Sequence, residues 1–141
     1  MRNGWTIPEN RYTRFIVDVS EPGEGLGWIY RPNPGCAERI IAITCGLITS
    51  ATVATRYVFL ALTDGATDRG YTASTYGQPA SRNVNYSAID GLNLPAVVLD
   101  LYVVIAWGNE VWINNTFWLR CYAVNMQLTD QFDMLSVTVE R

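Results

Sequence analysis

The chain contains no histidine and no lysine, and all ten of its basic residues are arginine. Without histidine it cannot form a Ser-His-Asp or Cys-His nucleophile pair, and it has no imidazole to bind a metal ion. Without lysine it has neither a Schiff-base amine nor the lysine of a phosphate-binding P-loop. The side chains left for chemistry are carboxylates, thiols, hydroxyls and guanidinium groups. We therefore expect a protein that is not an enzyme and that uses no cofactor.

Charge is also scarce, because only 16% of the 141 residues are charged and the net charge is −3. The signs are interspersed with no basic stripe, which disfavours nucleic-acid binding. The longest apolar run, Leu94 to Trp107, is interrupted by Asp100, so no segment is expected to span a membrane. The first ten residues lack the apolar stretch of a signal peptide, and we expect the protein to stay in the cytoplasm where it is made.

Cysteine is rare and unevenly placed, at positions 36, 45 and 121. Three is an odd number, and the spacing is not that of a metal site. Cys45 and Cys121 lie within apolar segments, where a thiol is usually a small buried hydrophobic side chain. A disulfide or a reactive thiol is the alternative interpretation.

The stretch from Cys36 to Gly65 is the centre of the expected fold. It has two long segments of alternating β-branched and aromatic residues that end in an Asp-Gly turn, a pattern typical of β-strands. In the first segment the alternation places Ile41, Ile43, Cys45 and Leu47 on one face, with Ile40, Ala42 and Thr44 on the other. Both faces are largely apolar, so we expect both strands to be central ones covered on two sides.

Further strands are expected between turn signals along the rest of the chain. Their ranges are Arg11–Ser20 with Phe15, Val17 and Val19 inward, Trp28–Arg31, Gly70–Ser74, Asn83–Ala88, Ala96–Ala106, Phe117–Met126, and Leu135–Arg141 with Leu135, Val137 and Val139 inward. The two in the segment 65–95 are expected to be short, weak edge strands, because Gly, Ser, Thr and Asn dominate there. No segment has a convincing helical pattern. The sequence predicts an all-β, single-domain antiparallel β-sandwich of about eight strands, jelly-roll-like, over residues 11–141, after an N-terminal arm at residues 1–10.

Two groups of acidic residues are candidates for chemistry. Asp64, Asp68 and Asp90 lie near turns and could bind calcium, but Asp-Gly is also ordinary turn chemistry, which we expect here. Asp130 and Asp133 could act as a paired acid and base of a hydrolase. Two solvated loop carboxylates are the expected alternative for that pair.

Aromatic and arginine side chains are the candidates for contacts with a partner. Exposed aromatic residues can stack on sugars or fill a partner's pocket, although core packing is their commoner use. Arginine favours planar, bidentate pairing at interfaces. The expected interface residues are Trp5, Arg39, Arg56, Tyr71, Tyr76, Tyr86, Trp107 and Trp112.

The central run PNPGCAERIIAITCGLITSATVATRYVFLALTDG resembles a pattern in small structural proteins of tailed-bacteriophage virions. In that pattern a Pro-Gly loop leads to an apolar strand, a T-S-A-T-V-A-x-R connection (here Thr49 to Arg56) and a second strand ending in Asp-Gly. The segment QPAS at 78–81 with Tyr86-Ser87, and the tail LTDQFDMLSVTVE, fit the same pattern. The family usually has Asn where this chain has Thr55.

The resemblance implies a β-sandwich virion component, built in the host cytoplasm and present in many copies. The expected function is a capsid decoration, or cement, protein that stabilises the head. Its expected partners are its own copies, as a homo-oligomer and specifically a trimer, and the major capsid protein or another virion protein. A neck, tail or fibre-base position is one alternative, and a carbohydrate-binding β-sandwich module is another.

Overall fold

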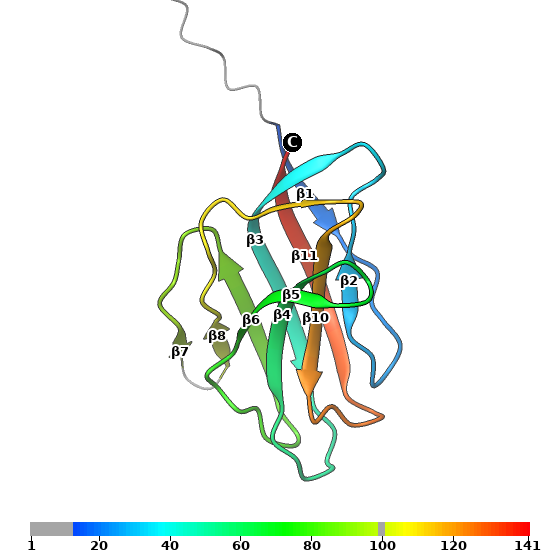
Figure 1. Ribbon diagram of the computed structural model, residues 1–141. Helices are drawn as coiled ribbons and strands as arrows, with labels where there is room; N and C mark the ends of the chain where they lie inside the picture. The colour runs from blue at the N-terminus through cyan, green and yellow to red at the C-terminus, as the bar shows by residue number, and fades with distance from the viewer. Residues whose placement is uncertain (1–12, 99–100) are drawn as a thin grey trace, which may run out of the picture.

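The computed structural model describes residues 13–98 and 101–141, which form eleven β-strands. The strands are β1 (Arg14–Asp18), β2 (Trp28–Tyr30), β3 (Ala37–Ile48), β4 (Tyr57–Thr63), β5 (Asp68–Ala73), β6 (Asn83–Ile89), β7 (Ala96–Val98), β8 (Tyr102–Val104), β9 (Trp112–Asn114), β10 (Trp118–Val124) and β11 (Gln131–Glu140) (Figure 1). Within these ranges the chain forms no helix, and so none that is long and apolar enough to cross a membrane. The expected N-terminal arm, residues 1–10, lies outside the described residues.

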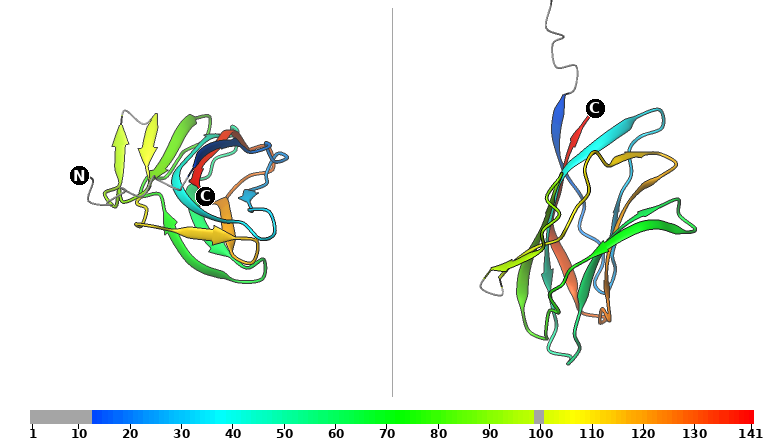
Figure 2. Two further views of the ribbon diagram at one scale, coloured as in Figure 1. Left: turned by 90° about the horizontal axis from the view of Figure 1, so that it is seen from above. Right: turned by 60° about the vertical axis from the view of Figure 1, so that its left-hand side comes forward.

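The strands form two sheets that pack face to face as a β-sandwich (Figure 2). The larger sheet has the order β1-β11-β3-β6-β8-β7, with β9 pairing with one end of β3. The smaller sheet has the order β2-β10-β4-β5. The pairings are antiparallel except that of β6 with β8, which is parallel. This confirms the predicted all-β sandwich.

Eight of the strands have the connectivity of a jelly roll. Without β7, β8 and β9, the two sheets read β1-β11-β3-β6 and β2-β10-β4-β5. The chain changes sheets after β1, β2 and β3, and again after β5, β6 and β10, which gives two interlocked Greek keys. The three short strands are therefore an insertion between β6 and β10, where the sequence predicted one strand at 96–106 and none at β9.

The core lies between the sheets, and a bulge in β3 decides which of its residues enter it. Thr138 pairs with Ala42 and Val139 with Ile40, so Ile41 is an extra residue in β3. Ile40 is therefore buried together with Ile43, Cys45 and Leu47. The prediction that Ile40 lies on the face opposite to Ile43, Cys45 and Leu47 was wrong, because strict alternation does not survive a bulge.

Three other predictions differ from the structure, at β6, at 96–106 and at Phe15 of β1. The segment 83–89 is not an edge strand, because β6 lies between β3 and β8 and buries Val84, Tyr86 and Ala88. The single strand expected at 96–106 is divided into β7 and β8. Phe15, predicted to be inward, is 38% exposed because β1 is an edge strand. The inward positions of Leu135, Val137 and Val139 are confirmed.

Candidate interaction surface

The turn acids bind their own backbone and neighbouring arginines. Asp64 accepts hydrogen bonds from the backbone N–H groups of Thr67 and Ala66 at 2.8 and 2.9 Å, which lower the pKa of its carboxyl. Asp90 accepts from Arg39 at 2.9 Å and from the N–H of Glu110. The contacts of Asp64 are those of an ordinary turn, whereas Asp90 joins its loop to β3 and to the segment before β9. Over the described ranges, no three side chains of the metal-binding types gather into a group that could hold an ion.

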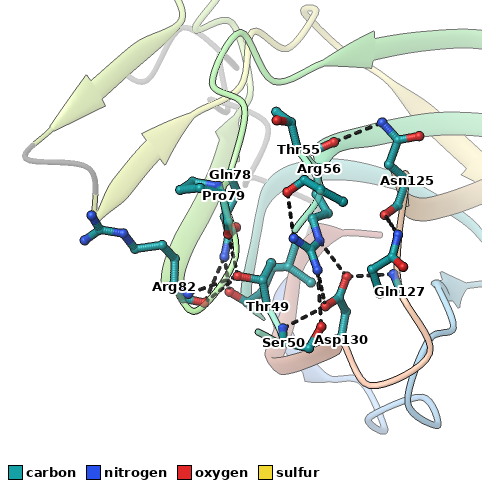
Figure 3. A network of polar contacts seen from close by, with 12 residues as sticks. Thr49, Ser50, Thr55, Arg56, Gln78, Pro79, Arg82, Asn125, Gln127 and Asp130 are labelled. Atoms are coloured by element: carbon teal, nitrogen blue, oxygen red, sulfur yellow. Dashed lines mark hydrogen bonds and ion pairs between the residues drawn. The ribbon is translucent and has the colours of Figure 1, made fainter. Parts of the chain in front are cut away.

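Asp130 and Asp133, considered as an acid–base pair, lie in different environments. Asp130 is fully buried and accepts from Arg56 Nε at 2.8 Å and Arg56 Nη2 at 2.9 Å (Figure 3). Burial alone would raise the pKa of Asp130, but hydrogen bonds from Arg56, the N–H of Gln127 and Ser50 hold it below its ordinary value. Burial, and next the negative charge of Glu21, raise the pKa of Asp133. Asp130 is thus a structural ion-pair partner and not the solvated loop acid expected.

The Arg56–Asp130 pair belongs to a polar network that holds several loops at one end of the sandwich (Figure 3). Ser50 N–H donates to Asp130, which joins the loop after β3 to the loop after β10. Thr49 Oγ1 donates to the carbonyl of Pro79 at 2.7 Å, and Gln78 Nε2 donates to that of Leu47 at 2.7 Å. The loops at this end therefore have fixed positions relative to one another.

The eight interface residues expected from the sequence do not lie together in the structure. Arg56, Tyr86 and Trp107 are 0%, 2% and 6% exposed, so these three lie in the interior and cannot form a surface, which corrects that expectation. Arg56 belongs to the buried polar network, and Tyr86 and Trp107 belong to the core. Arg39 is partly exposed and contacts Asp90 and Glu140.

The other candidates lie nearer the surface or outside the described residues. Tyr71 and Trp112 are exposed, at 71% and 43%, while Tyr76 packs partly buried against the core. Trp5 lies outside the described residues. No single patch therefore collects the predicted set.

A different set of exposed apolar side chains lies around β7 and β8, and all of them except Ile89, the last residue of β6, belong to the inserted segment. We call it the hairpin surface. It comprises Ile89 (44% exposed), Leu92 (37%), Leu94 (72%), Val97 (42%), Leu101 (47%) and Tyr102 (57%). These side chains lie on both faces of the sheet, because Tyr102 precedes Val103 in β8 and so faces the side opposite to Val97. Exposed apolar side chains gathered in one segment are typical of interaction sites.

The exposure of Val97 follows from the different widths of the two sheets. The smaller sheet ends at β5, whereas the larger one continues past β6 with β8 and β7, at the left of Figure 1. Val97 pairs with Val103 and so faces the same side of the sheet. Val103 of β8 is 1% exposed, whereas Val97 of β7 is 42% exposed. The buried part of the larger sheet therefore ends between β8 and β7.

An apolar pocket of about 180 Å³ lies beside this surface. Its walls are Leu60 and Leu62 of β4, the edge strand β5 around Tyr71, and the segment from Trp107 to Val111. The indole Nε1 of Trp107 is buried and has no hydrogen-bond partner among the described residues. An apolar group that fills the pocket would therefore break no hydrogen bond at that nitrogen.

The sequence analysis did not predict the hairpin surface, because an apolar run of residues predicts a buried strand. Leu94 to Trp107 has the composition of a core strand, and the width of the facing sheet is not encoded locally. Pro95 and Asp100 were the available signals, because each interrupts a central strand.

The chain was compared with known protein-family models, curated protein sequences and solved structures, and no match was found in any of the three.

Proposed function

We propose that this protein is a structural subunit of a tailed-bacteriophage virion, and more specifically a capsid decoration protein that stabilises the head. Its partners are its own copies and the major capsid protein. The observation that carries the proposal is the hairpin surface, six exposed apolar side chains of which five lie on the insertion between β6 and β10 and one, Ile89, ends β6. A neck, tail or fibre-base position remains open within the same class.

Three further features support a role in assembly. The chain lacks histidine and lysine, and the turn acids and Asp130 are engaged by arginines or backbone N–H groups. The jelly roll is an architecture of viral capsid domains, although it also occurs in lectins, so fold alone does not assign function. The bacteriophage setting rests on the sequence resemblance of the segment 32–65 and its flanks.

The mechanism is burial of apolar surface at repeated contacts. Each contact gains about 25 cal/mol per Å² of apolar area before the costs of association are subtracted. A shell that carries many copies adds these small gains over the whole particle. Such a protein can brace a capsid without a reaction.

The proposal is tested on purified virions of the phage that encodes the chain. We expect the chain in gradient-purified particles in a fixed ratio to the major capsid protein, measured by quantitative mass spectrometry. Particles assembled without it should lose their DNA at a lower temperature. If the chain is absent from purified particles, the proposal is wrong, and if it is present only with tail proteins the decoration role is wrong.

A carbohydrate-binding module is a second candidate, favoured by a groove on the outer face of the larger sheet. The groove, about 350 Å³, is lined by the hydroxyl and amide side chains of Thr44, Ser87 and Asn85 beside the exposed ring of Tyr102. A ring next to hydrogen-bonding groups suits a sugar. Saturable binding on a glycan array that Tyr102→Ala abolishes would support this candidate, and no binding at millimolar sugar would remove it.

A further inference from the structure

We infer that residues 1–12 of one copy of this chain bind the free edge of β5 in a second copy. They add a strand to the smaller sheet and direct Trp5 and Ile7 into the apolar pocket beside β5. The inference rests on the proposed function and specifies the contact between copies that it requires. The segment that binds lies outside the described residues, and the site that receives it lies within them.

The edge of β5 offers backbone groups for one more strand. β5 is the last strand of the smaller sheet, and no described strand pairs with its other side. Ser74 N–H donates to the carbonyl of Val58 at 2.8 Å, so these two residues form a hydrogen-bonded pair just beyond β5. Such pairs alternate along an antiparallel ladder, which directs the N–H and C=O groups of Tyr71 and Ala73 away from β4. An extended segment can bind these groups by strand addition.

The pocket lies where the inward side chains of an added strand would be. Gly70 and Thr72 of β5 pair with Leu62 and Leu60, and all four residues line the pocket. Gly70 has no side chain, and a Cβ there would meet no atom within 4 Å. The pocket volume of about 180 Å³ suits one ring-sized side chain, because an apolar cavity of about 150 Å³ holds benzene. The space between the sheets is therefore incompletely filled beside β5.

The different widths of the two sheets leave space for an added strand. Trp107 and Val111, which follow β8, line the same pocket as β5. The free edge of β5 is therefore on the side of the sandwich where the larger sheet continues with β8 and β7. Val97 of β7 faces the same side of that sheet as the buried Val103, yet it is 42% exposed. A fifth strand beside β5 would extend the smaller sheet toward this uncovered part.

The sequence of residues 1–12 has the pattern that this site requires. From Trp5 to Ile7 the chain alternates apolar, polar and apolar residues. In an extended segment the side chains of Trp5 and Ile7 therefore face the same side. Gly70 and Thr72 have the same spacing in β5, so Trp5 and Ile7 can lie beside them on the inward face.

Charge also favours this segment at this site. Residues 1–12 contain Arg2, Arg11 and one acid, Glu9. Glu110, in the segment 107–111 beside the pocket, is exposed and makes no ion pair with another described residue. A segment with an excess of arginine is therefore attracted to this side of the pocket.

The geometry favours a second copy as the source of the segment. Thr13 leads into β1 and exchanges two hydrogen bonds of 3.1 Å with Arg141. β1 ends the larger sheet on one side, whereas the pocket adjoins the segment that follows β8, toward the other side. Six residues from Ile7 to Thr13 span at most about 20 Å. Strand spacings of about 4.8 Å and a sheet separation of about 10 Å would take nearly all of that length within one copy.

The contact is head-to-tail, because the segment and the edge are different surfaces of the chain. Head-to-tail contacts close into rings when the rotation between copies permits. In a ring each copy donates one segment and receives one. A ring of three would agree with the trimer expected from the sequence resemblance.

The experiment is sedimentation of the purified full-length chain, with Ile7→Asp as the test variant and Thr6→Asp as the matched control. Both variants add the same charge, but residue 6 faces away from the pocket in the added strand. We expect a wild-type oligomer, about a hundredfold weaker association for Ile7→Asp because a buried unpaired charge is costly, and no change for Thr6→Asp. Circular dichroism spectra should match for all three. A monomeric wild type, or equal effects of the two variants, would overturn the inference.

A mixing experiment tests whether the pocket beside β5 receives the segment. Gly70→Leu places a side chain in the pocket and should leave the circular dichroism spectrum unchanged. Gly70→Leu and Ile7→Asp should each be monomeric alone. Their mixture should form a one-to-one dimer and nothing larger, because only one intact segment and one intact edge remain in each pair. No association on mixing, or normal assembly of Gly70→Leu alone, would overturn the pocket as the receiving site.

The outcomes separate this inference from the proposed function. A chain that is monomeric in solution but present in purified virions overturns the segment exchange and leaves the virion role intact. An oligomer that Ile7→Asp dissociates, formed by a chain absent from virions, does the reverse.

Discussion

Arg56 and Asp130 form a bidentate ion pair in the interior, with both side chains fully buried and N–O distances of 2.8 and 2.9 Å. They are 74 residues apart in the sequence. Arg56 also donates to the carbonyl of Ala54 at 2.7 Å and to the hydroxyl of Ser50, so most of its donors are satisfied. The pair fixes the loops that follow β3 and β10 against each other.

Asp130→Asn should lower the free energy of unfolding by about 3–5 kcal/mol, because removing one partner leaves the other buried charge uncompensated. Urea denaturation at pH 7 measures this. Asp68→Asn, which breaks the exposed contact with Arg120, is the control and should change it by less than about 1 kcal/mol. An equal effect of both changes would contradict a special role for the buried pair. Because the folded pKa of Asp130 is lowered, its contribution is present above the unfolded pKa of about 3.9 and is lost as pH falls through the folded value.

Asp133→Asn should have the opposite sign. The pKa of Asp133 is raised by burial and by Glu21, so its ionised form destabilises the fold at neutral pH. That penalty is absent below the unfolded pKa of about 3.9 and appears as pH rises through the folded value. We expect the variant to unfold at a higher urea concentration than wild type at pH 7, with the difference vanishing near pH 3. A difference that does not vary with pH would refute the electrostatic explanation.

Gly27→Ala should destabilise the protein by about 1–3 kcal/mol, because a Cβ at this position would lie 2.4 Å from the carbonyl oxygen of Cys121. The close approach lies immediately before β2, where it pairs with β10. Gly70→Ala is the matched control, because no atom lies within 4 Å of the added Cβ and stability should be unchanged or slightly higher. Thermal unfolding of both variants checks this, and equal melting temperatures would show that β2 adjusts freely.

Thiol reactivity should distinguish the three cysteines. Cys45 and Cys121 are buried, and burial together with the neighbouring Cys45 thiol raises the pKa of Cys121. Cys36 is partly exposed. Because the thiolate is the reactive form, a thiol reagent at pH 8 should label Cys36 quickly and the other two only after unfolding. Mass spectrometry of the labelled chain identifies the sites, and fast labelling of Cys121 would contradict a closed core.

Local patterns in the sequence were enough to predict most strands. Period-two patterns of β-branched and aromatic residues predicted β3 and β4, alternation of apolar and polar residues predicted β11, and the turn signals around Asp64-Gly65 predicted where β4 ends. The same alternation failed at Ile41, where a bulge shifts the register, and at 96–106, where one apolar run covers two strands. In both cases the deciding factor is the neighbouring strand, which local alternation does not contain.

The candidate surface could not be predicted for a related reason. Val97 is apolar, as core residues are, and the narrower facing sheet leaves it exposed. Conversely, Arg56 was expected near an interface because of its charge, yet its partner Asp130 makes burial tolerable. Whether a side chain is covered depends on residues far along the chain.

The amino-acid sequence alone determined that this chain is all-β, because strand periodicity is a local property, and its composition contains no histidine and no lysine. The tertiary structure decided which strands became neighbours, which charge was buried with a partner, and which apolar side chains were left uncovered. Those properties depend on contacts between residues distant in the sequence, and they exist only once the two sheets have packed.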